Sequence, residues 1–214
     1  MSEQGGDPAC WADRVCEQCG RLIEHEPHVC GLRSPIVVTG PPGAGKSVVG
    51  RALAERFSRS VLVAGDEFFA FLARGRIDPW LPESQRQNEI VTRAAGSSTG
   101  AYVRGGYATV YDGVIGPWFL PTFATATGLY SLEYVLLLPS EERCVENVRT
   151  RTGHAFSDHD ATRKMHLEFA KATIDERHVL RDPPDGVDAV VDLILAGVAD
   201  GRFRYEVSSA AALP

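Results

Sequence analysis

The sequence lacks any apolar run close to the roughly 20 residues that a membrane-spanning helix needs. Its first residues, Met1 to Pro8, are polar and acidic, which is not the pattern of a secretory signal. These two absences exclude a membrane-embedded protein and predict a cytoplasmic one.

Basic residues are also scarce. The chain has 22 Lys and Arg against 28 Asp and Glu, a net charge of −6. A protein that holds a long polynucleotide usually presents a basic surface, because neutralising phosphates supplies much of the affinity. The charge balance therefore argues against a nucleic-acid partner and favours a small, phosphate-bearing ligand held by a few residues.

The 214 residues, 44% of them hydrophobic and 23% charged, suit one globular domain with some surplus at its ends. Three zones are distinguishable: a Cys- and His-rich extension over residues 1–33, a domain over 34–200, and a short tail over 201–214. No sequence feature fixes the oligomeric state, which stays open between monomer and homodimer.

Four of the five cysteines lie in the first 30 residues, and in a cytosolic chain such clustering indicates metal binding more than disulfides. Thiolates and an imidazole can hold Zn²⁺ tetrahedrally in a closed, structural site. The preferred ligand set is Cys16, Cys19, His28 and Cys30, with Cys10 and His25 as alternates. The competing interpretation is a reduced tail with incidental cysteines.

In the central zone, short β-branched runs alternate with helical stripes. Such alternation predicts a three-layer α/β fold, in which helices cover both faces of a parallel five-stranded sheet and ligands bind at the carboxyl ends of the strands. The expected strands are 35–39, 60–64, 108–111, 134–138 and 178–180. One expected helix begins near residue 46, and the other main helices cover 83–104, 141–149, 160–174 and 187–198.

The first strand leads into a glycine-rich loop that reads Gly40-Pro41-Pro42-Gly43-Ala44-Gly45-Lys46-Ser47, and a helix follows. This sequence fits G-x-x-x-x-G-K-[ST] at every required position. The glycines allow the backbone amides to wrap around phosphate, and the helix directs its positive end at the same anion. Lys46 would reach the β- and γ-phosphates, and the Ser47 hydroxyl would bind Mg²⁺.

Two absences narrow the class of P-loop protein. An Asn-Lys-x-Asp segment, which GTPases need for guanine, does not occur. Asp66-Glu67 looks like the pair that motor ATPases use, but it follows the second strand, and Asp112 is followed by Gly113 and not by a glutamate that could activate water. The pattern therefore favours a kinase, in which an aspartate faces an acceptor hydroxyl.

From Pro35 to Val198 the chain resembles a group of P-loop kinases that includes gluconate kinase, shikimate kinase and chloramphenicol phosphotransferase, and it is similar to zeta-toxin-like and tunicamycin-resistance-like proteins. The resemblance rests on the glycine-rich loop and on three further segments: Gly65-Asp66, Tyr111-Asp112-Gly113, and Arg149-x-Arg151-x-x-His154. It implies an ATP- and Mg²⁺-dependent enzyme that phosphorylates a hydroxyl of a small molecule.

The resemblance also implies roles for single residues. Asp66 would be the base, Asp112 would bind Mg²⁺ with Ser47 or contact the acceptor, and Arg149 and Arg151 would close over the triphosphate from a lid. The nucleotide would contact Gly40, Pro42, Gly43, Ala44, Gly45, Lys46, Ser47 and Val48. The competing interpretations are a helix cap for Asp66, a turn residue for Asp112, and solvated surface positions for the arginines.

The acceptor is expected to lie beside Asp66 and Asp112, among Phe69, Asn88 and Trp118. Aromatic side chains there would suit a partly apolar acceptor such as an antibiotic or another secondary metabolite, although burial in a core is the commoner fate of aromatic residues. Two other functions compete with a small-molecule kinase: a nucleotide-dependent regulator whose zinc knuckle recruits a partner protein, and a polynucleotide 5′-kinase.

Overall fold

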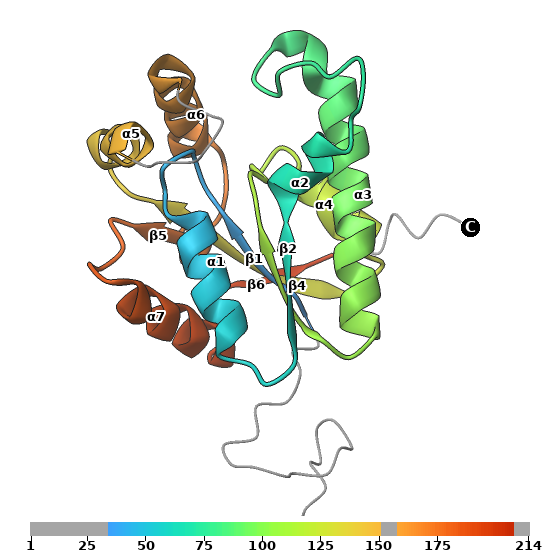
Figure 1. The fold of residues 1–214 in the computed structure, drawn as a ribbon. Coiled ribbons are helices and arrows are strands. Elements are labelled where there is room, and N and C mark those ends of the chain that lie inside the picture. Colours follow the sequence, from blue (N-terminus) through green and yellow to red (C-terminus); the bar gives the residue numbers. More distant parts are fainter. Residues whose placement is uncertain (1–33, 151–157, 208–214) are drawn as a thin grey trace, which may run out of the picture.

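The structure is a computed structural model, and it describes residues 34–150 and 158–207. A parallel sheet forms its centre, with strand order β2-β3-β1-β4-β5 and helices on both faces (Figure 1). This confirms the predicted α/β class and the five parallel strands. The strands are β1 (Ile36–Thr39), β2 (Ser60–Ala64), β3 (Ala108–Asp112), β4 (Ser131–Leu138), β5 (Val179–Arg181) and β6 (Arg204–Glu206).

One face of the sheet is covered by α1 (Lys46–Glu55) and α7 (Val187–Ala199), and the other by α3 (Gln85–Arg104) and α4 (Leu120–Thr127) (Figure 1). Three further helices lie toward the carboxyl ends of the parallel strands: α2 (Gly65–Ala70), α5 (Glu141–Thr150) and α6 (His159–Lys171). Two single 3-10 turns, η2 (Pro82–Ser84) and η3 (Glu176–His178), precede α3 and β5.

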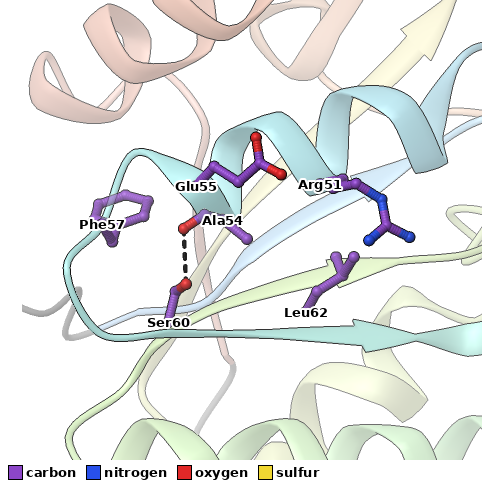
Figure 2. Close-up of a pocket in the computed structure, with 6 residues that line it drawn as sticks. All are labelled: Arg51, Ala54, Glu55, Phe57, Ser60 and Leu62. Carbon is purple, nitrogen blue, oxygen red and sulfur yellow. Dashed lines mark hydrogen bonds between the residues drawn. The ribbon is translucent and has the colours of Figure 1, made fainter.

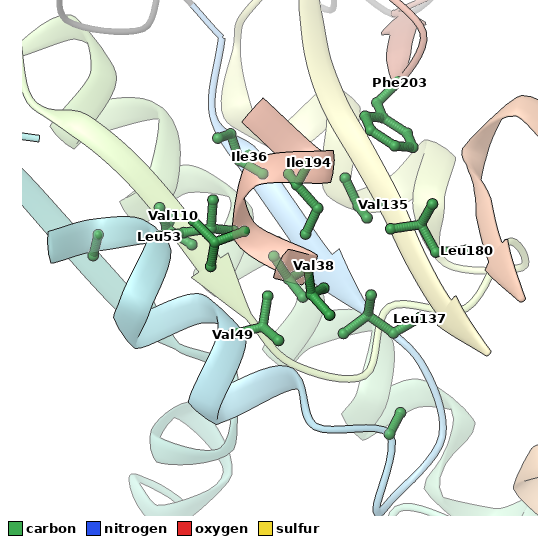
Figure 3. Packing of buried hydrophobic residues seen from close by; sticks show 14 of the residues in the cluster. Ile36, Val38, Val49, Leu53, Val110, Val135, Leu137, Leu180, Ile194 and Phe203 are labelled. Carbon is green, nitrogen blue, oxygen red and sulfur yellow. The ribbon is translucent and has the colours of Figure 1, made fainter. Parts of the chain in front are cut away.

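The sheet divides the core into two clusters because side chains alternate along each strand. Ile36 and Val38 of β1 pack with Leu53 of α1 and Ile194 of α7 on one face (Figure 3). Val37 between them packs on the other face, in the cluster that contains Phe123 of α4. Burial on both faces explains why the central strands read as continuous apolar runs.

Helix α3 runs unbroken through Gly96 and Gly100, although two glycines weaken a helix on propensity alone. A Cβ atom at either position would collide with backbone of α4, at the carbonyl oxygens of Phe123 and Thr127. The glycines therefore allow α4 to pack directly on α3. Helix α4 was not predicted from the sequence, because it has only eight residues and three of them are threonines, which favour helices weakly.

The predicted boundary at residue 200 needs a correction, because the sheet continues into the segment expected as a tail. Strand β6 pairs antiparallel with residues 131–133 of β4, which also explains why β4 begins before the predicted residue 134. Phe203 is fully buried, and its ring packs on Gly197 of α7. The α/β domain therefore extends at least to Glu206.

Within the described ranges, no helix is both long enough and apolar enough to cross a membrane. The same ranges contain no group of three His, Cys, Asp or Glu side chains that could hold a metal ion. The predicted zinc ligands Cys16, Cys19, His28 and Cys30 lie outside the described residues, as do the alternates Cys10 and His25. Zinc binding stays a prediction from the sequence.

The burial of Phe203 makes the contribution of β6 measurable. Phe203→Ala should lower the free energy of unfolding by about 3–5 kcal/mol, the usual cost of removing a fully buried phenylalanine. Arg204→Ala, on the exposed first residue of β6 next to Phe203, should change it by less than about 1 kcal/mol. Urea denaturation measures both values, and an unchanged stability in Phe203→Ala would contradict the extended domain boundary.

Candidate active site

The glycine-rich loop joins β1 to α1 and turns sharply at three glycines with left-handed backbone angles. The φ values are 147° at Gly40, 80° at Gly43 and 89° at Gly45, where glycine alone is free of steric penalty. Gly45 is the N-cap of α1, and its carbonyl accepts the first helical hydrogen bond from Val49 at 3.1 Å. The loop therefore ends on the positive end of a ten-residue helix, which favours an anion.

The loop packs against β4 and α5 at Gly40 and Gly43, whereas the space beside Gly45 is open. A Cβ atom at Gly40 would collide with the Leu137 carbonyl of β4, and one at Gly43 with the Cys144 carbonyl of α5. At Gly45 no atom lies within 4 Å of an added Cβ atom. The Cys144 side chain is buried, and burial raises the pKa of its thiol to about 11, so the thiol stays protonated and inert.

Lys46 and Ser47 occupy the first turn of α1, at the open end of the loop. Lys46 Nζ donates a hydrogen bond to the Pro41 carbonyl at 3.0 Å, so the side chain lies along the loop. Ser47 and Val48 are exposed, whereas the loop residues Pro42 and Ala44 are buried. Among the described residues, the amides of Gly43 and Gly45 donate no backbone hydrogen bond.

The two aspartates singled out in the sequence lie at the ends of neighbouring strands. Ala64 of β2 pairs with Asp112 of β3, and Asp66 follows in the first turn of α2. Asp66 is exposed, and Asp112 is 8% exposed. The N-cap of α2 is Ala64, with no side-chain capping bond, so the alternative role of Asp66 as the helix cap is wrong.

Tyr111 belongs to the segment Tyr111-Asp112-Gly113 that carries the resemblance, but the sequence assigned it no role of its own. Its side chain is buried, and its hydroxyl lies so close to Gly65 and Gly113 that a Cβ atom on either glycine would collide with it. Burial, then the charges of Asp66 and Asp112, hold the pKa of the phenol far above its usual value. Tyr111 therefore remains a neutral O–H group next to both carboxylates.

Asp112 also lies against α1. Gly50 packs on it so closely that a Cβ atom on Gly50 would be 3.2 Å from Asp112 Cβ, and Ser47 lies one turn earlier on the same helix. A serine hydroxyl and a carboxylate beside an anion site are oxygen donors of the kind that Mg²⁺ prefers. The residues present therefore fit the predicted magnesium site.

The connection between β3 and α4 is fixed to β1 and β4 by buried hydrogen bonds. The Ile115 amide donates to Thr39 Oγ1 at 2.9 Å, and the Ile115 carbonyl accepts from the Tyr134 hydroxyl at 2.7 Å. This connection carries Trp118, whose side chain is 45% exposed and whose ring lies 5.1 Å from that of Phe169 on α6. Trp118 is thus an exposed aromatic side chain on a rigid support.

The other two predicted acceptor residues differ in their surroundings. Phe69, on α2, is half-buried. Asn88 is buried, and its amide nitrogen donates to the Pro79 carbonyl at 2.7 Å and to Ser84 Oγ at 2.9 Å. The amide nitrogen of Asn88 therefore fixes the loop between α2 and α3, and a contact of Asn88 with the acceptor stays a prediction.

The predicted lid arginines lie at and beyond the end of α5. Arg149 is exposed and donates to both carboxylate oxygens of Glu146, at 2.8 and 2.7 Å. Arg151 lies outside the described residues, as does His154. In this structure Arg149 is therefore held on its own helix, and the loop is not among its hydrogen-bond partners.

A shallow pocket lies between α1 and the edge strand β2, away from the glycine-rich loop (Figure 2). Its wall includes Ser60, the first residue of β2, whose hydroxyl donates to the Ala54 carbonyl at 2.7 Å (Figure 2). The lining residues are Arg51, Ala54, Glu55, Phe57, Ser60 and Leu62. None of them is a predicted site residue, so this pocket is separate from the site at the strand ends.

The fold matches those of solved structures, two of which are named as kinases. A sugar kinase from a Janibacter species aligns with a TM-score of 0.60 at 15% identity, over 85% of this chain and 99% of that one. The tunicamycin resistance protein of Deinococcus radiodurans aligns at 0.57 and 18% identity, over 77% and 95%. A gluconokinase from Sinorhizobium meliloti aligns at 0.54 and 23% identity, over 79% and 94%.

By sequence alone, no family model matches the chain and no curated protein matches it. The structural matches confirm the P-loop kinase fold that the sequence predicted. Since all three are below 25% identity, they establish the fold and leave the reaction to be argued from the site.

The different surroundings of the loop glycines lead to a stability prediction. Gly43→Ala should lower the melting temperature more than Gly45→Ala does, although both positions have similar positive φ values. At Gly43 the added methyl meets the Cys144 carbonyl, whereas at Gly45 it meets open space and costs backbone strain alone, of the order of 1 kcal/mol. Thermal denaturation of the two variants compares them; equal losses would contradict the close contact of the loop with α5.

Proposed function

We propose that this chain is a small-molecule kinase, which transfers the γ-phosphoryl group of Mg²⁺-ATP to an alcohol hydroxyl. One observation carries the proposal: Asp66 and Asp112 lie at the carboxyl ends of neighbouring strands. The glycine-rich loop, here called the phosphate loop, follows the adjacent strand β1 at the same end of the sheet. The P-loop kinase fold of the structural matches supports the same reaction class.

In this proposal the loop amides and the N-terminus of α1 bind the β- and γ-phosphates, and Lys46 moves from the Pro41 carbonyl to the phosphate oxygens. Ser47 and Asp112 would hold Mg²⁺. The ion, when bound, neutralises charge on the two terminal phosphates. Orientation and charge compensation supply most of the catalysis in phosphoryl transfer, so these contacts matter more than covalent chemistry.

Asp66 acts as the base. Its carboxylate accepts the proton of the acceptor hydroxyl as the alcohol oxygen forms its bond to the γ-phosphorus. The bond from the γ-phosphorus to the bridging oxygen breaks, and ADP leaves with that electron pair. Arg149 and Arg151 stabilise the transferring group after the lid closes; for Arg149 this requires the exposed ion pair with Glu146 to open, which costs little in water.

The acceptor is proposed to be partly apolar, such as an antibiotic or another secondary metabolite. Trp118 supports this class, because a half-exposed indole fixed on Phe169 offers a flat apolar surface on the connection that follows Asp112. Phe69 on α2 supplies a second aromatic side chain near Asp66. One of the structural matches is named for resistance to an antibiotic, which agrees with this acceptor class.

Asp66→Asn tests the reaction. The variant should bind Mg²⁺-ATP with unchanged affinity and transfer phosphate about 100-fold more slowly or worse, because it loses the base and keeps the phosphate loop. Transfer is measured with radiolabelled ATP and a panel of hydroxylated metabolites, and ATP affinity by calorimetry.

Glu67→Gln is the matched control, because Glu67 is the neighbouring exposed carboxylate of the same helical turn. It should leave transfer unchanged. The opposite result, loss of ATP consumption in Glu67→Gln with little effect in Asp66→Asn, would reject the kinase and indicate an ATPase whose glutamate orients water.

Trp118→Ala tests the acceptor class. Once the panel identifies an acceptor, the variant should raise its KM about 10-fold or more and leave the KM for ATP unchanged, because the indole contacts the acceptor alone. Trp118→Phe should retain most of the affinity. A preference of the panel for sugars or sugar acids, with no effect of Trp118→Ala, would contradict a partly apolar acceptor.

A further inference from the structure

Helix α5 reaches the phosphate loop from behind through one long-range hydrogen bond. Asn147 Nδ2 donates to the Gly43 carbonyl at 2.9 Å, although the two residues are far apart in the sequence. One turn earlier on the same helix, the Cys144 carbonyl lies against the α-carbon of Gly43. Two contacts from α5 therefore meet at a single residue of the loop.

The bond to Gly43 sets the direction of a whole peptide unit. The Gly43 carbonyl and the Ala44 amide belong to one planar group, so fixing the first fixes the second. The Ala44 amide donates to the Pro41 carbonyl at 3.2 Å, and the same carbonyl accepts from Lys46 Nζ at 3.0 Å. A continuous chain of polar contacts thus runs from α5 through the loop to Lys46.

The side chain that makes this bond is not part of the core. Asn147 is exposed, as are its neighbours Glu146 and Arg149. An exposed amide contributes little to the packing of the domain. This one, however, bonds to Gly43, whose α-carbon lies directly against the Cys144 carbonyl. Its contribution therefore concerns the shape of the loop more than the stability of the fold.

We propose that Asn147 is a positioning residue of the phosphate loop, which holds the Gly43–Ala44 peptide in the orientation that nucleotide binding requires. This inference rests on the proposed function for the identity of the ligand, Mg²⁺-ATP. It adds a second task for α5, which also carries Arg149 toward the lid. Asn147 itself need not contact the nucleotide.

The test is calorimetric titration of Mg²⁺-ATP into the full-length protein and two variants. Asn147→Ala removes the side chain, and Asn147→Leu keeps its size while removing the hydrogen bond. Both should bind Mg²⁺-ATP about 3- to 10-fold more weakly, as expected for one hydrogen bond. Melting temperatures measured without nucleotide should stay within about 2 °C of the wild type, since the residue is exposed.

Gln85→Ala is the matched control, because it removes an exposed side-chain amide from α3, whose hydrogen bond goes to Glu89 of the same helix. It should leave ATP affinity unchanged. Wild-type affinity in both Asn147 variants would overturn the proposal, and so would a loss confined to Asn147→Ala, which would reveal a packing effect. A fall in melting temperature that matches the fall in affinity would also overturn it, because the bond would then serve the fold.

The failure of this inference and that of the proposed function are separable, because the titration needs no acceptor. A wild type that binds Mg²⁺-ATP but phosphorylates no alcohol would reject the kinase and leave the role of Asn147 standing. A wild type that binds no Mg²⁺-ATP would reject both.

Discussion

The site depends on one steric constraint: the glycine-rich loop must fit against two backbone carbonyls of other elements. Gly40 lies against Leu137 of β4, and Gly43 lies against Cys144 of α5, with no room for a side chain at either contact. The strand on one side and the helix on the other determine the path of the loop. Gly45 has no such contact, so the need for glycine there comes from its left-handed backbone angle and not from packing.

Most of the fold could be predicted from the sequence because its strands are buried on both faces and its helices have apolar stripes. The parts that escaped prediction lack such a signal. Helix α4 is short and rich in Thr, and it depends on Gly96 and Gly100 of α3 for its close packing. Strand β6 has only three residues, and what fixes it is the burial of Phe203 beside it, a long-range contact that no local pattern indicates.

The candidate site shows the same division. The loop motif and the places of the two aspartates could be predicted from local sequence, since each lies at or near the end of a strand. The contacts of Tyr111 and Asn147 could not, because a tyrosine inside an apolar strand and an asparagine on a polar helix face look ordinary. Their contacts with Gly65, Gly113 and Gly43 arise only when distant segments pack together. The sequence placed Asn88 among the acceptor residues, and the contact it could not predict is the one by which the amide nitrogen supports a loop.

The order of the strands has a consequence for when the glycine-rich loop takes its final conformation during synthesis. The central strand β1 pairs with β3 and β4, which are made much later, so β1 must wait unpaired while the intervening chain emerges. The loop that follows β1 has no backing until β4 and α5 have been made and have docked. The segment that is most recognisable in the sequence is therefore among the last to reach its working shape, and a nascent chain that stops short of α5 carries the motif without the site.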